Sequence, residues 1–155
     1  MTQTLTPILA AHPFFHGFDA RTLNLVAGCA RNVQFEREHY LFHEGEAANA
    51  FYLIRSGKVA LETSAAPHRP VIIETIEPNE VLGWSWLFPP YRWHFTARAI
   101  EPVHALLLDG ACLRAKGEAD HDLGYELVRR AAQILMQRLQ ATRLQLLDMY
   151  YVDTD

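Results

Sequence analysis

The sequence has little lysine and no concentration of positive charge. Its 155 residues include 14 Lys and Arg against 18 Asp and Glu, for a formal net charge of -4, and the only lysines are Lys58 and Lys116. A protein that binds nucleic acid regardless of sequence needs clustered cations, which displace counterions from the phosphates. The charge balance therefore argues against general nucleic-acid binding.

Long apolar runs and extra cysteines are also missing. No stretch of about 18 apolar residues exists, and the first residues lack the basic segment of a secretory signal, so we expect no membrane span. Cys29 and Cys112 are the only cysteines and have no metal-ligand spacing. We expect them to be free, buried thiols in a reducing compartment, which would be the cytoplasm.

The first feature that the sequence does contain is a pattern of short strands. Asp19 is a candidate N-cap for a short amphipathic helix, and alternating apolar residues follow from Val33 to about residue 109. Gly and Pro interrupt the alternation, notably at Ser56-Gly57, Pro78-Asn79 and Glu101-Pro102. Strands eight to twelve residues apart with such turns predict an antiparallel sandwich or barrel. We expect one domain over residues 1–155, with the helix and the β-region at about 13–120.

The last thirty residues have a different texture and predict one long helix over about 121–150. This segment has no proline, and no glycine after Gly124. One apolar seam recurs at alternating spacings of four and three: Val128, Ala132, Leu135, Leu139, Thr142, Leu146 and Met149. A second stripe lies beside it: Leu123, Leu127, Ala131 and Ile134. Two stripes need two partners, so we expect one to pack on the β-region and the other to form a homodimer.

The densest aromatic stretch is GWSWLFPPYRWHF, residues 83–95, which we call the cassette. It holds all three tryptophans of the chain, one cation, Arg92, and one titratable imidazole, His94. So many aromatic side chains form either a core or the wall of a binding site.

Several segments, in order, carry a family resemblance. They are LFHEGE at 41–46, FYLIRSGKV at 51–59, NEVLG at 79–83 and ARA at 97–99. Together they resemble the cyclic-nucleotide-binding domain of bacterial catabolite-activator-like and fumarate-nitrate-reductase-like regulators. The resemblance implies a mainly β fold with flanking helices: a double-stranded β-helix, that is a jelly-roll-like β-roll, with an N-terminal helix and a long C-terminal dimer helix.

The resemblance also assigns roles within the cassette, and the residues here depart from them. In the family a glycine, a glutamate and, about nine residues later, an arginine with a hydroxyl residue hold the ribose and the cyclic phosphate. Gly83 matches the glycine, but Trp84 stands at the glutamate, Trp93 at the arginine and His94 at the hydroxyl residue. We therefore interpret the cassette as degenerate. The candidate ligand-binding residues are Gly83, Trp84, Ser85, Arg92, Trp93 and His94.

The expected function is a stand-alone regulatory or sensory domain. It would not bind cyclic AMP in the usual way, and it would act through an unknown protein partner or small ligand. The family's helix-turn-helix normally follows the dimer helix, and none is visible in this sequence, so we expect no DNA binding by this chain. Catalytic motifs such as G-x-S-x-G are missing, so we expect no enzyme activity and no metal.

Two alternatives stay open. One is a true sensor of cyclic AMP or cyclic GMP in which Arg92, one position out of register, holds the phosphate. The other is a small cupin-like metalloprotein that uses His39, His43 and Glu44, although these residues lack the usual cupin spacing.

Overall fold

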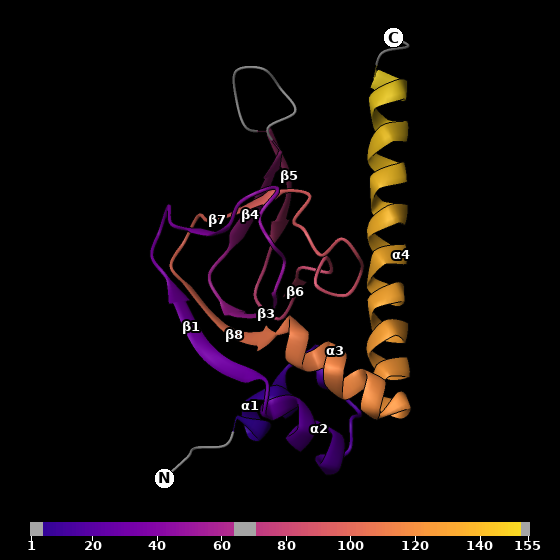
Figure 1. The fold of residues 1–155 in the computed structure, drawn as a ribbon. Helices are drawn as coiled ribbons and strands as arrows, with labels where there is room; N and C mark the ends of the chain where they lie inside the picture. The colour runs from indigo at the N-terminus through magenta and orange to yellow at the C-terminus, as the bar shows by residue number, and fades with distance from the viewer. Residues whose placement is uncertain (1–4, 64–70, 153–155) are drawn as a thin grey trace.

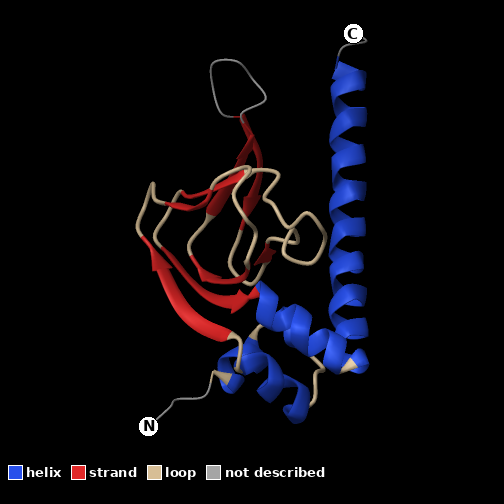
Figure 2. Cartoon of the chain, viewed as in Figure 1, coloured by secondary structure: helices blue, strands red, loops and turns tan. Residues whose placement is uncertain are grey.

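Two four-stranded antiparallel sheets face each other and form a β-roll, with short helices below it and one long helix beside it (Figures 1 and 2). The structure is a computed structural model that describes residues 5–63 and 71–152. The helices are α1 (Thr6–Ala11), the 3-10 turn η1 (Pro13–Phe15), α2 (Ala20–Ala27), α3 (Gly110–Ala119) and α4 (His121–Val152). The strands are β1 (Ala30–Phe35), β2 (Tyr40–Phe42), β3 (Ala50–Ser56), β4 (Val59–Thr63), β5 (Val71–Ile76), β6 (Val81–Leu82), β7 (Thr96–Ala99) and β8 (Val103–Asp109).

The first sheet has the strand order β1-β8-β3-β6 and the second β2-β7-β4-β5. Side chains of the first sheet alternate between its two faces, as the period of a strand requires. On β3, Tyr52 and Ile54 point into the β-roll, whereas Phe51 and Leu53 point outward toward the helices. The predicted β-roll with flanking helices is thus confirmed.

This alternation produces two separate hydrophobic cores. The inner core lies between the sheets and includes Phe42, Leu61, Ile76 and Trp93. The outer core lies between the first sheet and the helices. The central strands β3 and β8 are largely buried on both faces, which explains why β3 reads as a nearly continuous apolar run.

The long helix α4 has 32 residues, equivalent to about 48 Å, and stands alongside the β-roll (Figure 1). The second stripe of the sequence packs into the outer core, where Leu123, Leu127 and Ala131 are buried. Further along the helix, Arg138 fixes α4 to the β-roll: its Nη2 donates to the carbonyl of Val81 (2.9 Å) and its Nε lies 3.4 Å from a carboxylate oxygen of Glu74. No described helix is both long and apolar enough to cross a membrane.

Local signals in the sequence account for several boundaries. The Asp19 carboxylate accepts from the Thr22 amide at 2.7 Å, which confirms it as the N-cap of α2. Gly57 lies between β3 and β4 with a φ of 86°, and a Cβ there would meet the Pro102 carbonyl oxygen at 2.1 Å, so only glycine fits this turn. The sequence did not predict α1 or α3.

The prediction of free thiols is wrong: Cys29 and Cys112 form a disulfide. Cys29 lies at the junction of α2 and β1, and Cys112 lies in the first turn of α3. Packing of both helices against the same end of the first sheet brings the two Cα atoms to 5.7 Å despite a separation of 83 residues in sequence. The expectation of a reducing compartment rested on free thiols and therefore loses that support.

Candidate ligand-binding cassette

The cassette runs from the end of β6 to the start of β7 and consists of turns. Gly83 opens it with a φ of 98°, and the Leu87 amide then donates to the Trp84 carbonyl at 3.0 Å. No helix forms in residues 83–95. The short helix that the family places after this glycine, whose N-terminus would face a phosphate, is therefore not formed here.

Trp84 points away from the interior of the β-roll. Its ring lies in the outer core, with centroids 4.8 Å from Phe51 and 5.8 Å from Phe14. The indole is 8% exposed, and its Nε1 has no hydrogen-bond partner in the described part of the chain. Trp84 therefore packs between the first sheet and the helices, and it does not face the space between the two sheets.

Trp93 points the other way, into the inner core. Its ring stacks on Phe42, with centroids 3.7 Å apart and planes within 8° of parallel. It also lies directly beneath Gly83, because a Cβ on that glycine would come within 2.6 Å of the ring. An indole thus occupies the space under Gly83, at the position where the family carries its phosphate-binding arginine.

The two tryptophans consequently lie on opposite sides of the first sheet. The sequence grouped them as neighbours in one cassette, but the structure does not bring Trp84 and Trp93 together into one pocket wall. Periodicity could not separate them, because the cassette is not a regular strand or helix.

Arg92 and His94 flank Trp93 and are both exposed. The guanidinium of Arg92 donates to the Gly45 carbonyl at 2.9 Å, and Arg92 pairs with Ala47 in an isolated bridge. This geometry follows from the one-residue offset, since neighbouring residues in an extended segment point to opposite sides. Ser85 is half-buried within the first turn of the cassette.

Trp86 is a structural residue that the sequence reasoning did not single out. It is fully buried, its Nε1 donates to the Gly83 carbonyl at 2.8 Å, and its ring lies 5.4 Å from that of Phe51. The Arg114 side chain of α3 donates to the Trp86 carbonyl and lies over the ring of Tyr91 at 4.1 Å. These contacts fix the cassette to α3.

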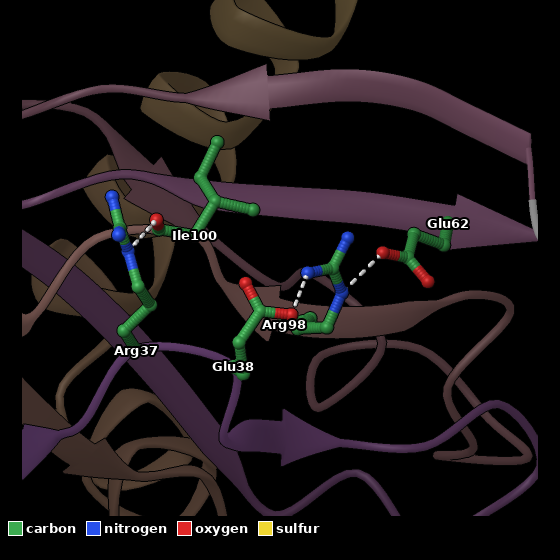
Figure 3. Close-up of polar contacts among 5 residues, drawn as sticks. All are labelled: Arg37, Glu38, Glu62, Arg98 and Ile100. Atoms are coloured by element: carbon green, nitrogen blue, oxygen red, sulfur yellow. Dashed lines mark hydrogen bonds and ion pairs between the residues drawn. The ribbon is translucent and has the colours of Figure 1, made fainter.

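A charged network marks the outer face of the second sheet (Figure 3). Arg98 bonds Glu62 through Nε and Glu38 through Nη1, each at 2.6 Å. The side chain of Glu62 is only 5% exposed, and its hydrogen bond is the main reason that the pKa of Arg98 is raised. Arg37 nearby donates to the Ile100 carbonyl at 3.1 Å. The network joins the turn before β2 to β4 and β7.

The histidines considered for a metal site each contact a nearby glutamate. His39 contacts Glu36 at 3.8 Å, and His43 contacts Glu46 at 3.4 Å. Within residues 5–63 and 71–152, no group of three or more His, Cys, Asp or Glu is arranged to hold a metal ion. The arrangement gives no geometric support to a cupin-like centre.

Comparison with known proteins agrees with the fold. The family model described as the cyclic nucleotide-binding domain matches residues 32–120. A CRP-like cAMP-activated global transcriptional regulator of Mycobacterium tuberculosis is 28% identical over 146 residues, which cover 94% of this chain and 63% of that protein. An acetyltransferase Pat of Mycolicibacterium smegmatis is 31% identical over 103 residues, covering 66% of this chain and 31% of that protein. The chain thus spans less than two thirds of the length of these curated relatives.

Solved structures extend the agreement. A putative cyclic nucleotide-binding protein from Geobacter metallireducens superimposes with a TM-score of 0.78 at 27% identity, covering 90% of this chain and 99% of that one. The catabolite activator protein of Thermus thermophilus, at 24% identity and a TM-score of 0.68, shares the fold over 86% of this chain and 61% of its own. The family match spans more than half of the sequence, and the chain belongs to the cyclic nucleotide-binding domain family.

Proposed function

We propose that this chain is a regulatory domain of the family whose cassette no longer binds cyclic nucleotides. One observation carries the proposal: the Trp93 ring, stacked on Phe42, fills the space beneath Gly83. A cyclic phosphate there would lack a cation to offset the loss of its hydration, which is a large cost for a charged group. Arg92 does not replace that cation, because its guanidinium is bonded to Gly45 on the outside.

The proposed domain has no catalytic role, needs no metal or other cofactor, and acts by binding a small ligand or a protein partner. It would also bind no DNA itself. The net charge of -4 supports the proposed absence of DNA binding, because contacts with DNA phosphates favour a basic surface. Fluorescence anisotropy with a labelled duplex at low salt tests it, and saturable binding that weakens with salt would contradict it.

We also propose that the chain forms a homodimer through α4. All seven seam residues are exposed: Val128, Ala132, Leu135, Leu139, Thr142, Leu146 and Met149. Near the end of this seam, Met149 is 65% exposed and Leu146 is 53% exposed. A seam of apolar side chains at heptad spacing is typical of a helix that packs against a second helix.

Isothermal titration calorimetry with cyclic AMP and cyclic GMP tests the central part of this function. We expect no saturable heat for either nucleotide. Micromolar binding that disappears in Arg92→Ala would establish the alternative, a true cyclic-nucleotide sensor. A matched substitution of an exposed arginine elsewhere, Arg129→Ala, controls for general loss of charge.

A further inference from the structure

A cavity opens at the end of the β-roll where β1, β3 and β8 meet α3. Its volume is about 1000 Å³. The cassette contributes only Trp93 to its lining, and α4 contributes nothing. Figure 1 shows β1 and α4 on opposite sides of the β-roll, so this cavity lies away from the long helix.

One wall of the cavity is aromatic and apolar. Phe42 and Trp93, the stacked pair of the inner core, both line it, together with Leu107 of β8. Aromatic rings add about 0.5–1.5 kcal/mol per pair beyond the area that they bury. This wall therefore suits a ligand with a flat aromatic body.

A buried tyrosine, Tyr52, also lines the cavity. Tyr52 is 5% exposed, and its hydroxyl donates to the Leu41 carbonyl at 3.5 Å, the outer limit for such a bond. Burial raises the pKa of Tyr52 to about 12, further above neutral pH than the ordinary value of about 10. The phenol thus retains a proton that a ligand oxygen could accept at a better distance.

The charged side chains that line the cavity differ in whether they have hydrogen-bond partners. The Glu46 carboxylate accepts from the His43 amide at 2.7 Å, and the Asp109 carboxylate accepts from the Cys112 amide at 2.8 Å. Arg31, whose Cα lies opposite Leu107 in the β1–β8 ladder, makes no side-chain hydrogen bond or ion pair within the described residues. Arg31 is thus the uncommitted charge of this cavity.

We propose that this cavity is a ligand site for a flat aromatic monocarboxylate. The ring would lie against Phe42 and Trp93, and the carboxylate would bind between the Tyr52 hydroxyl and the Arg31 guanidinium. One cation and one hydroxyl donor match the two oxygens of a single carboxylate. Glu46 and Asp109 at the rim would repel a ligand with more negative charge. The inference rests on the proposed function, since it supplies a ligand for a regulatory domain whose cassette is filled.

Calorimetry with 2-naphthoate on the full chain tests the site, with the neutral 2-naphthalenemethanol as the matched probe. We expect one naphthoate per chain. Arg31→Met and Tyr52→Phe should each weaken binding, by between about tenfold and 150-fold for the lost bond to the charged group. Arg129→Met should leave naphthoate affinity unchanged, because Arg129 lies on α4 and does not line this cavity.

Thermal melts of each variant, which should stay close to the wild type, separate a lost site from a lost fold. The proposal is overturned if naphthoate fails to saturate, if the neutral alcohol binds equally well, or if Arg31→Met and Tyr52→Phe bind as the wild type does. Cyclic AMP binding that depends on Arg31 would also overturn the ligand class. Failure here would leave the proposed function standing, since that function is tested by cyclic-nucleotide binding, DNA binding and dimer mass and not by naphthoate binding.

Discussion

Gly83 and Gly45 have nearly the same backbone but different surroundings. Their φ angles are 98° and 89°, both in the region where a Cβ is disfavoured. A Cβ on Gly83 would lie 2.6 Å from the Trp93 ring, whereas a Cβ on Gly45 would meet no atom within 4 Å. A comparison of alanine substitutions at these two glycines therefore separates the effect of backbone strain from the effect of contact with the Trp93 ring.

We expect Gly83→Ala to lower the free energy of unfolding more than Gly45→Ala does. Both substitutions carry the strain of a left-handed residue, about 1–2 kcal/mol. Only Gly83→Ala adds overpacking against Trp93, typically about 1–3 kcal/mol. Urea unfolding measures the difference, and Trp93→Leu in the Gly83→Ala background should reduce it. Equal losses at both glycines would mean that Trp93 does not lie beneath Gly83.

His12 supplies a prediction about pH. It is 5% exposed, its Nδ1 accepts from the Phe14 amide at 3.2 Å, and burial lowers its pKa. In the unfolded chain the pKa of His12 stays near 6.5. Between that pH and the lower pKa of His12 in the folded state, the unfolded chain binds a proton that the folded chain does not. Stability from neutral His12 is therefore present above about pH 6.5 and lost as the pH falls through this window.

The substitution His12→Asn keeps an acceptor for the Phe14 amide and removes the titration. We expect this variant to lose less unfolding free energy than the wild type between about pH 7.5 and about pH 5.5. His16→Asn is the control, because His16 is exposed. Parallel pH profiles for wild type and His12→Asn would show that His12 is not buried in its neutral form.

At the scale of single elements, the proposed dimer depends on α4. Replacing Leu135 and Leu139 by Glu places two charges in the exposed seam, and we expect a monomer in size-exclusion chromatography with light scattering. The control is Gln133→Glu with Gln140→Glu, which adds the same charge at exposed positions outside the seam. An unchanged dimer mass for the Leu135 and Leu139 variant would contradict dimerisation through this seam.

The elements also show how far a sequence can be interpreted alone. Alternation, turn glycines and the Asp19 cap act over a few residues, and they predicted the strands, the turn at Gly57 and the start of α2. Helix α3 was missed because its ten residues include two glycines and only one large apolar side chain, Leu113, so helical spacing is weak there.

The side-chain directions in the cassette were harder to predict for another reason. Trp84 and Trp93 sit in irregular backbone, where no fixed period assigns a face. The resemblance aligned them with positions of known family roles, but only three-dimensional packing separates them between the outer and inner cores.

At the scale of the whole molecule, the disulfide links the two ends of the β-region. It closes a segment of 83 residues, from the junction of α2 and β1 to α3, and constrains the unfolded chain accordingly. Spacing alone could not predict it, because only the shared packing of α2 and α3 brings the sulfurs together. Cys29 and Cys112 line the same cavity as Arg31, so the effect of their loss on stability should be measured before any effect on ligand binding.

We expect Cys29→Ala with Cys112→Ala to lower the free energy of unfolding by about 2–4 kcal/mol. A reductant should lower the stability of the wild type by a similar amount and leave the double variant unchanged. Equal stability of the wild type and the double variant, with no response to reductant, would contradict the contribution assigned to this bond.

The central claim is that Trp93 closes the space beneath Gly83 to cyclic nucleotides. The most direct measurement is a nitrogen-15 NMR titration with cyclic AMP, which follows the Gly83 amide and the Trp93 indole N–H. We predict no saturable shift of either signal up to about 1 mM nucleotide, which bounds the binding free energy at about -4 kcal/mol. A saturable shift at both sites with micromolar affinity would contradict the claim.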